Sequence, residues 1–219
     1  MRSKSEMGVF SDYPHFYELK REGKQTSFLY ATRNSENSEF VISSVDGDFT
    51  LYGKNFIGVL RPNFAGTWFE LYDYGFDAKQ MGDLPKGFLP RQRHVQTIDY
   101  DSNFFAEKPR SFRITLFDLR PKFIGSDKIA HKFENLPPKY NEQRGCYTLN
   151  FFGRVQKASA RNFQLKRSVE EGEEEIDEFM LSHGKCSSNN FNLDFRAPFT
   201  PFGAFAISLT AIGKKRVVG

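Results

Sequence analysis

Apolar residues occur along this chain in two kinds of run. Most runs are short, alternate with polar residues and end at glycine, proline, asparagine or aspartate, which is typical of antiparallel strands. One run near the end of the sequence, residues 200–213 (TPFGAFAISLTAIG), would be apolar on every side of a helix. The pattern therefore predicts a mainly β protein with one hydrophobic α-helix.

The apolar run carries residues that begin and end helices. Thr200 can accept a hydrogen bond from the first turn, and Pro201 fits the first helical position. Gly213 suits the left-handed residue that follows a helix. We therefore expect a helix over about 201–212, roughly 18 Å long at ~1.5 Å per residue.

This helix is expected to lie inside the protein. Phe205 and Ile207 should be fully buried, and Ser208 and Thr210 can bond to carbonyl groups one turn earlier. A helix that is apolar all round is surrounded by protein or by lipid, and crossing a bilayer takes about 20 residues. We favour a core helix; the alternative is a re-entrant or membrane-inserted tail.

A sheet wrapped around the helix would account for the remaining runs, and closing that sheet into a barrel would remove its exposed edges. The sequence predicts a single domain over 1–219: a closed antiparallel β-barrel around a central C-terminal helix, after a polar lead-in at 1–12. Surface loops are expected at 74–92 and, with an acidic run, at 170–178. The expected strands are 26–32, 39–45, 48–52, 55–61, 67–73, 94–100, 111–117, 146–152, 162–167, 176–183 and 189–195.

Composition agrees with one large β domain. The 219 residues include 25 Phe and 9 Tyr, enough for a large core, and the net charge is +4. This small basic excess permits an anionic partner without requiring one. Two cysteines are too few for a disulfide framework and favour a reducing compartment. We expect no secretory signal, because the first residues lack an apolar core, and no transmembrane span.

No pattern in the sequence indicates catalysis or metal binding. Cys146 and Cys186 stand singly in strand patterns, where buried inert thiols are the better interpretation. No phosphate-binding glycine loop and no Gly-x-Ser-x-Gly motif occurs. We expect a protein that is not an enzyme and that uses no cofactor and no metal. The histidines lack the spacing of metal ligands: His15, His94, His131 and His183.

Three segments resemble the motifs of one family. Residues 55–69 (NFIGVLRPNFAGTWF) resemble a strand with Ile-Gly-x-Leu-Arg followed by a Gly-Thr-x-Phe turn and strand. Residues 149–164 (LNFFGRVQKASARNFQ) match Leu-Asn-Phe-x-Gly-Arg-Val and Ala-Ser-x-x-Asn-Phe-Gln, and residues 191–207 resemble a terminal Asp-Phe-Arg-x-Pro-Phe motif. On these segments the chain resembles the C-terminal domain of the tubby family. The resemblance implies a closed antiparallel barrel of about twelve strands threaded by a hydrophobic helix.

The resemblance also implies a lipid-binding module that is not an enzyme. Tubby-like domains bind phosphoinositides, especially phosphatidylinositol 4,5-bisphosphate, at the inner face of the plasma membrane, and some members carry cargo into cilia. By resemblance we expect a cytoplasmic, peripheral membrane protein, an adaptor in trafficking or signalling, with the cilium or nucleus as further locations. We expect a monomer. Nucleic-acid binding is disfavoured, because no stretch combines clustered Lys and Arg with stacking aromatic residues.

The family's head-group site corresponds to five positions of this sequence. The family places a Lys and an Arg two residues apart on one face of a strand, and these positions hold Val59 and Arg61 here. A further family Arg corresponds to Arg110, a family Asn to Glu39, and a reduced basic run to Arg33. The site has thus lost one cation and gained one anion. By this resemblance, binding is expected to be weaker by roughly ten- to a hundredfold.

Two interpretations of the altered site remain open. In the first, Arg61 and Arg110 still bind phosphate, and Trp68 faces outward as a membrane anchor or as a partly covered surface residue. In the second, Val59 and Glu39 mark a degraded head-group site. The protein would then be an interaction adaptor that docks partners through its loops.

Overall fold

The fold is described from a computed structural model of the chain. Some sequence predictions fall outside the residues that this structure describes: the lead-in at 1–12, most of the loop 74–92, the acidic run and Arg110. The described residues are 13–76, 92–101, 111–117, 130–143, 145–169 and 178–213.

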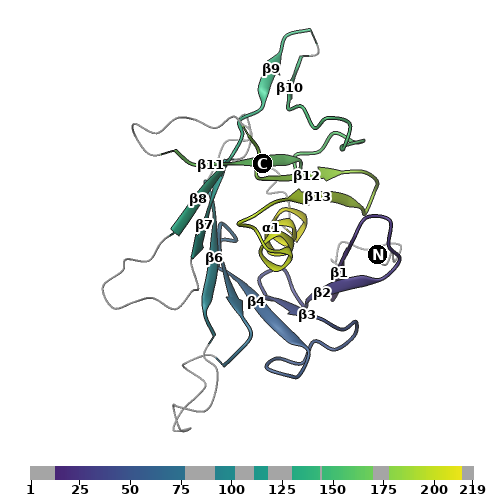
Figure 1. Cartoon of the computed structure of the whole chain (residues 1–219), viewed down its shortest axis with the longest axis vertical. Helices are drawn as coiled ribbons and strands as arrows, with labels where there is room; N and C mark the ends of the chain where they lie inside the picture. The colour runs from purple at the N-terminus through teal and green to yellow at the C-terminus, as the bar shows by residue number, and fades with distance from the viewer. Residues whose placement is uncertain are drawn as a thin grey trace.

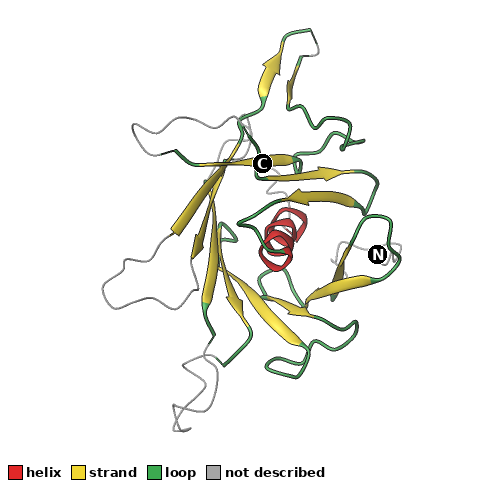
Figure 2. Cartoon of the chain, viewed as in Figure 1, coloured by secondary structure: helices red, strands yellow, loops and turns green. Residues whose placement is uncertain are grey.

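The described strands form one large antiparallel sheet that curves around a single helix (Figures 1 and 2). Eleven strands follow one another in chain order, except that the small hairpin β9–β10 is left out and projects from the sheet (Figure 1). The predicted mainly β fold with one C-terminal helix is therefore confirmed. The elements are β1 His15–Lys20, β2 Ser27–Arg33, β3 Phe40–Ser43, β4 Phe56–Pro62, β5 Trp68–Asp73, β6 His94–Tyr100, β7 Phe112–Phe117, β8 Ala130–Asn135, β9 Lys139–Asn141, β10 Cys146–Thr148, β11 Phe163–Arg167, β12 Leu181–Lys185, β13 Phe191–Phe195 and α1 Pro201–Gly213.

Helix α1 begins as predicted and fills the concave side of the sheet (Figure 1). The Thr200 hydroxyl accepts a hydrogen bond from the Gly203 backbone N–H at 3.1 Å, and Pro201 is the first helical residue. Phe205 is 3% exposed and Ile207 is 0% exposed. The helix is thus a core element enclosed by strands, as we favoured from the sequence.

The end of α1 differs from the prediction. Gly213 is the last helical residue and does not have a positive φ. A Cβ at this position would lie 2.5 Å from Cζ of Phe40, so glycine is needed here for space. The helix end is capped by Arg33, whose Nη1 donates a hydrogen bond of 2.8 Å to the Gly213 carbonyl. A cation at a helix C-terminus is favourable because it faces the negative end of the helix dipole.

The two hydroxyl residues of α1 have different partners. Thr210 donates to the Ile207 carbonyl at 2.7 Å, as predicted, and its oxygen lies 2.8 Å from the Tyr100 hydroxyl. Ser208 was expected to bond within the helix, but its hydroxyl lies 3.0 Å from Nε2 of His183 on β12. The prediction for Ser208 was wrong because a buried strand residue offers it a partner outside the helix.

His183 is a buried histidine between two aromatic rings. It is 0% exposed, and its ring stacks on Phe163 and Phe191 at centroid distances of 5.0 and 4.9 Å. Its Nδ1 lies 2.9 Å from the Arg161 carbonyl, which can only accept. Nδ1 therefore donates, and Nε2 accepts from Ser208. Burial lowers the pKa of His183 to about 4, because the charged ring would lose its hydration.

The predicted closure of the sheet into a barrel is not confirmed. Among the described strands, β1 pairs with β2 alone and β13 with β12 alone. The gap between β1 and β13 is bridged by Arg154, whose Nη1 lies 3.0 Å from the Glu22 carboxylate and whose Nη2 lies 2.7 Å from the Asp194 carboxylate. We call this gap the seam. The ends of the sheet are thus linked here by side chains and not by a described ladder of backbone hydrogen bonds.

Candidate functional site

The predicted site lies on the outer face of β4, near the end of that strand. Leu60 faces the core and is 0% exposed, so Val59 and Arg61 both face outward, as the alternation of the strand predicted. Glu39 immediately precedes β3, which is hydrogen-bonded to β4. The structure therefore brings three of the five predicted positions to one patch.

Arg61 is held among acidic and aromatic side chains. Its Nε donates to the Glu39 carboxylate at 3.2 Å, and its guanidinium carbon lies 5.1 Å from the centre of the Tyr72 ring. Glu70 stands opposite Arg61 in the register of β4 and β5 and accepts from the Tyr72 hydroxyl at 3.3 Å. Two anionic residues thus surround one cation, and a phosphate would have to compete with Glu39 for the guanidinium.

Val59 faces outward but is not accessible. It is 0% exposed and packs with Val41 and Phe56 beneath the side chains of Phe49 and Tyr52. Residues 48–52, predicted to be a strand, form an irregular connection with a turn at 51–52, and its two aromatic side chains pack on this cluster. A lysine at Val59 would therefore be covered, although alternation places this position on the same face as Arg61.

Arg33 lies on the other face of the sheet. It is 5% exposed, and its guanidinium caps α1 and stacks over Phe40 with its carbon 4.6 Å from the ring centre. Its Nε donates to the Ser38 carbonyl at 3.2 Å, and burial lowers the pKa of the guanidinium. Arg33 therefore belongs to the core and is not part of the Arg61 patch. Arg110 lies outside the described residues.

The hairpin that joins β4 to β5 carries apolar side chains beside Arg61. Trp68 is 39% exposed while Phe69 is 3% exposed, which confirms the predicted outward orientation of Trp68. Phe64, at the tip, is 94% exposed. The tip is held in place because the Asn63 side-chain oxygen accepts from the backbone N–H groups of Thr67 and Trp68 at 2.9 and 3.2 Å.

Two features of this site were missed at the sequence level, although a signal existed for each. Phe64 is an aromatic residue in the middle of a Pro-Asn-x-Ala-Gly turn, where side chains are normally polar. Glu70 could have been placed opposite Arg61 by counting outward from that turn along both strands.

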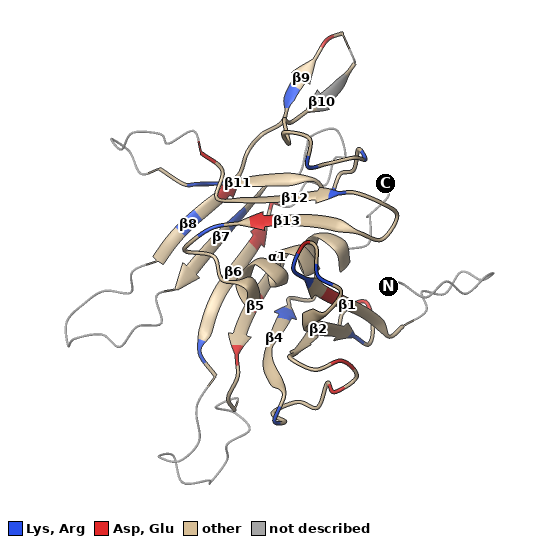
Figure 3. Ribbon diagram, turned by 45° about the vertical axis from the view of Figure 1, so that its right-hand side comes forward, with Lys and Arg blue, Asp and Glu red and all other residues tan. Residues whose placement is uncertain are grey.

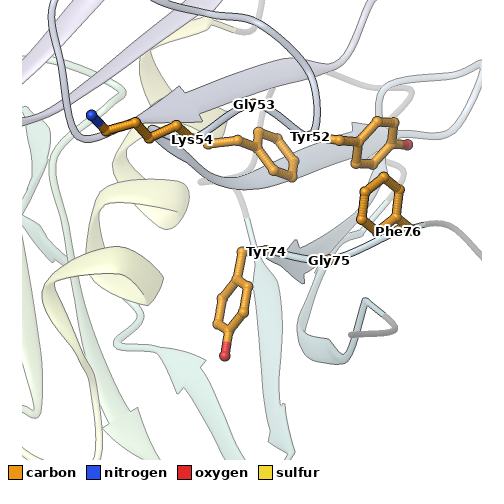
Figure 4. A pocket seen from close by; sticks show the side chains of 7 residues that line it. Tyr52, Gly53, Lys54, Tyr74, Gly75 and Phe76 are labelled. Atoms are coloured by element: carbon orange, nitrogen blue, oxygen red, sulfur yellow. The ribbon is translucent and has the colours of Figure 1, made fainter. Parts of the chain in front are cut away.

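A shallow hollow of about 170 Å³ lies at the other end of β4 from Arg61 (Figure 4). Its wall includes Tyr52, which stacks on Phe76 at a centroid distance of 5.4 Å, and Phe56. The amine of Lys54 points away from this aromatic pair (Figure 4). No set of polar groups converges on the hollow, so we assign no ligand to it.

Neither a metal site nor a membrane span is found in the part of the chain that the structure describes. No three His, Cys, Asp or Glu side chains there are grouped so that they could hold a metal ion. No described helix has the length and apolar character needed to cross a bilayer. Cys186, which the strand pattern predicted to be buried, is only half-buried, with its sulfur 3.7 Å from the carbonyl oxygens of Arg154 and Gly184.

Comparison with known proteins identifies the family. A match to the Tub family covers residues 1–123 and 122–214. Tubby-related protein 2 of Mus musculus is 30% identical over 95% of this chain and 40% of its own length. Protein king tubby 2 of Culex quinquefasciatus is 31% identical over 98% of this chain and 53% of its own length. The chain therefore belongs to the Tub family, and it spans about two fifths to one half of these relatives.

Proposed function

We propose that this Tub-family domain is a peripheral membrane module that binds phosphoinositide, above all phosphatidylinositol 4,5-bisphosphate, through Arg61. One observation carries the proposal. Arg61 lies partly exposed on the outer face of β4, directly before a hairpin whose Phe64 and Trp68 project into solvent. A guanidinium can bind phosphate oxygens in a bidentate manner, and aromatic side chains favour the head-group level of a bilayer. Membership of the Tub family supports the same assignment.

The acidic neighbours set the strength of this binding. The side chains of Arg61 and Glu39 are 28% and 32% exposed, so their ion pair contributes only about 0.2–1 kcal/mol and can open. A phosphate that replaces Glu39 still meets the negative charge of Glu70 nearby. The domain should therefore bind bisphosphate-containing membranes weakly, and it should release them readily as salt rises. Weak, reversible attachment suits an adaptor that tethers partners in trafficking or signalling.

Vesicle co-sedimentation tests the proposal. Phosphatidylcholine vesicles with and without phosphatidylinositol 4,5-bisphosphate are compared, using the parent, Arg61→Ala and Glu39→Gln. Loss of a charged hydrogen bond should reduce binding roughly ten- to a hundredfold in Arg61→Ala. Removal of the competing anion should raise it roughly fivefold in Glu39→Gln.

Arg113→Ala is the matched control for this experiment. Arg113 is an outward-facing arginine of β7 that pairs with Asp101 at 3.1 Å, three strands from Arg61 in the order of the sheet. Its replacement removes the same charge and should change binding by less than about twofold. If Arg61→Ala and Arg113→Ala bind equally well, Arg61 does not form the site.

The Arg61–Glu39 ion pair and the covered Val59 favour a second candidate function, that of a protein-interaction adaptor. In this case Glu39 neutralises the charge of Arg61 on the outer face of β4, and this face does not bind head groups. Vesicle binding that is absent at low salt for the parent and for Glu39→Gln would select this candidate.

A further inference from the structure

A second surface of the domain lies at the seam, where Arg154 holds the β1–β2 turn against β13. Arg154 uses both ends of its guanidinium for the carboxylates of Glu22 and Asp194, so its charge is compensated locally. These bonds fix the positions of three segments that are far apart in the sequence. The other side chains of these three segments therefore lie on one surface of the domain.

Four cations lie on the segments next to this bridge. Arg21 and Lys24 flank Glu22 in the exposed β1–β2 turn. Lys157 and Lys185 are neighbours, because the Lys157 backbone N–H donates to the Lys185 carbonyl at 3.0 Å. Within the described ranges, no ion pair is found for any of the four, whereas the cations Arg61, Arg93, Arg113 and Arg196 each pair with a carboxylate. Figure 3 shows the basic segments of the β1–β2 turn and the end of β12.

An exposed aromatic residue stands beside the bridge. Phe152 is 69% exposed and adopts φ 50°, a left-handed conformation that is uncommon for a bulky residue. The turn is held by the Asn150 side-chain oxygen, which accepts from the Phe152 N–H at 2.9 Å, and by a 2.9 Å bond from the Arg154 N–H to the Phe151 carbonyl. Such strain persists only where the surroundings impose it, and it often marks functional positions.

We infer that this seam patch, formed by Arg21, Lys24, Phe152, Lys157 and Lys185, is a second membrane-docking surface that recognises anionic lipid by charge density. The inference rests on the proposed function in that it assigns a further contact to the same membrane module. Three of the four cations are lysines, which are point charges without the planar fork of arginine, so the patch needs negative charge and no particular head group. Phosphatidylserine should therefore be sufficient.

The apolar component favours a lipid surface over nucleic acid. Single-stranded nucleic acids are bound by several aromatic side chains that stack successive bases along a basic groove. The seam patch has one protruding Phe152 ring, which lies 6.1 Å from the Phe179 ring. One exposed aromatic ring and several cations on the segments joined by Arg154 match an interfacial contact, in which the ring enters the head-group layer while the cations stay at its surface.

The test uses phosphatidylcholine vesicles containing phosphatidylserine and no phosphoinositide. Each near-surface cation is worth roughly a factor of five in binding, so Lys157→Gln/Lys185→Gln should bind roughly 20- to 30-fold more weakly than the parent. Lys54→Gln/Lys139→Gln, which changes two lysines outside the patch, has the same net charge and should lose less than about threefold. The salt dependence should be shallower for the seam variant than for the control.

Phe152→Asn provides a second, independent variant. Asn adopts left-handed conformations more readily than Phe, so the turn should be at least as stable as before. Binding should nevertheless fall several-fold, and this loss should persist at high salt because it is apolar. Unfolding midpoints equal to that of the parent establish that each variant is folded.

The outcomes separate this inference from the proposed function. If phosphoinositide vesicles bind through Arg61 and the seam variants behave like the control, the inference is overturned while the proposed function stands. If phosphatidylserine binding depends on the seam and Arg61→Ala has no effect on phosphoinositide vesicles, the inference stands and the role of Arg61 does not. A parent that binds neither vesicle, or that binds single-stranded DNA through the seam in place of vesicles, overturns the inference.

Discussion

Acidification should destabilise this domain through His183, before most carboxylates titrate. In the folded protein His183 is sealed between two aromatic rings, with both nitrogens engaged by Arg161 and Ser208. Burial lowers its pKa from 6.5 to about 4. The unfolded chain therefore takes up a proton near pH 6.5, whereas the folded protein does not do so until about pH 4.

The sign and size of the effect follow from these two pKa values. Between them the unfolded state binds more protons, so the free energy of unfolding falls as the pH falls. The loss is about 1.4 kcal/mol per pH unit and about 3 kcal/mol over the whole interval from 6.5 to 4. This is a large part of the 5–15 kcal/mol that typically separates folded from unfolded domains. The stability should be fully present above pH 6.5.

Urea unfolding at a series of pH values from 7.5 to about 4.5 measures this loss. His183→Gln, which can still bond to Arg161 and Ser208, should be less stable at pH 7.5 because ring stacking is lost, but its stability should depend much less on pH. His131→Gln, at a partly exposed position of β8, controls for the loss of a histidine as such. If His183→Gln shows the same pH dependence as the parent, His183 is not the group responsible and the reasoning fails.

Four further substitutions or measurements test other parts of the account. Phe205→Ala should lower the free energy of unfolding by about 3–5 kcal/mol, and a stable, well-expressed variant would show that α1 is peripheral. Val59→Lys buries an ammonium group under aromatic side chains, so it should cost about 3 kcal/mol or more in urea unfolding and should not strengthen vesicle binding; a stable variant with stronger binding would mean that this face is open. Arg33→Met should cost about 1.5–3 kcal/mol, because the Gly213 carbonyl loses its charged donor, while vesicle binding stays unchanged. Trp68 fluorescence should shift to the blue on addition of anionic vesicles, and an unchanged spectrum despite measured binding would remove Trp68 from the contact.

Local chemistry accounts for the parts of the fold that the sequence predicted well. The cap at Thr200, the all-round apolar character of α1 and the alternation that directs Trp68 outward each depend on residues within a few positions. Strands such as β1 and β8 were not predicted, since their polar faces weaken the alternating pattern. Sheet closure could not be decided from sequence, because it depends on how the first and last strands meet.

The candidate site was harder to predict because its decisive contacts are long-range. Arg33 and Gly213 are 180 residues apart, so no local pattern could show that this arginine caps the helix. Val59 has the outward orientation that alternation predicts, but its cover comes from a connection that resembles a strand in sequence. The Arg61–Glu39 contact joins two positions that the family resemblance indicates separately, and it changes the expected charge of the site.

Titration of the folded domain with soluble inositol trisphosphate, observed through the arginine Nε–Hε signals by NMR, tests the assignment of Arg61 most directly. The Arg61 signal should shift progressively as its Nε exchanges the Glu39 carboxylate for phosphate, and Glu39→Gln should move the midpoint to lower concentration. The Arg113 signal should move little, because its ion pair with Asp101 lies three strands from Arg61 in the order of the sheet. An Arg61 signal that stays in place while the signals of other arginines shift would contradict the proposed head-group site.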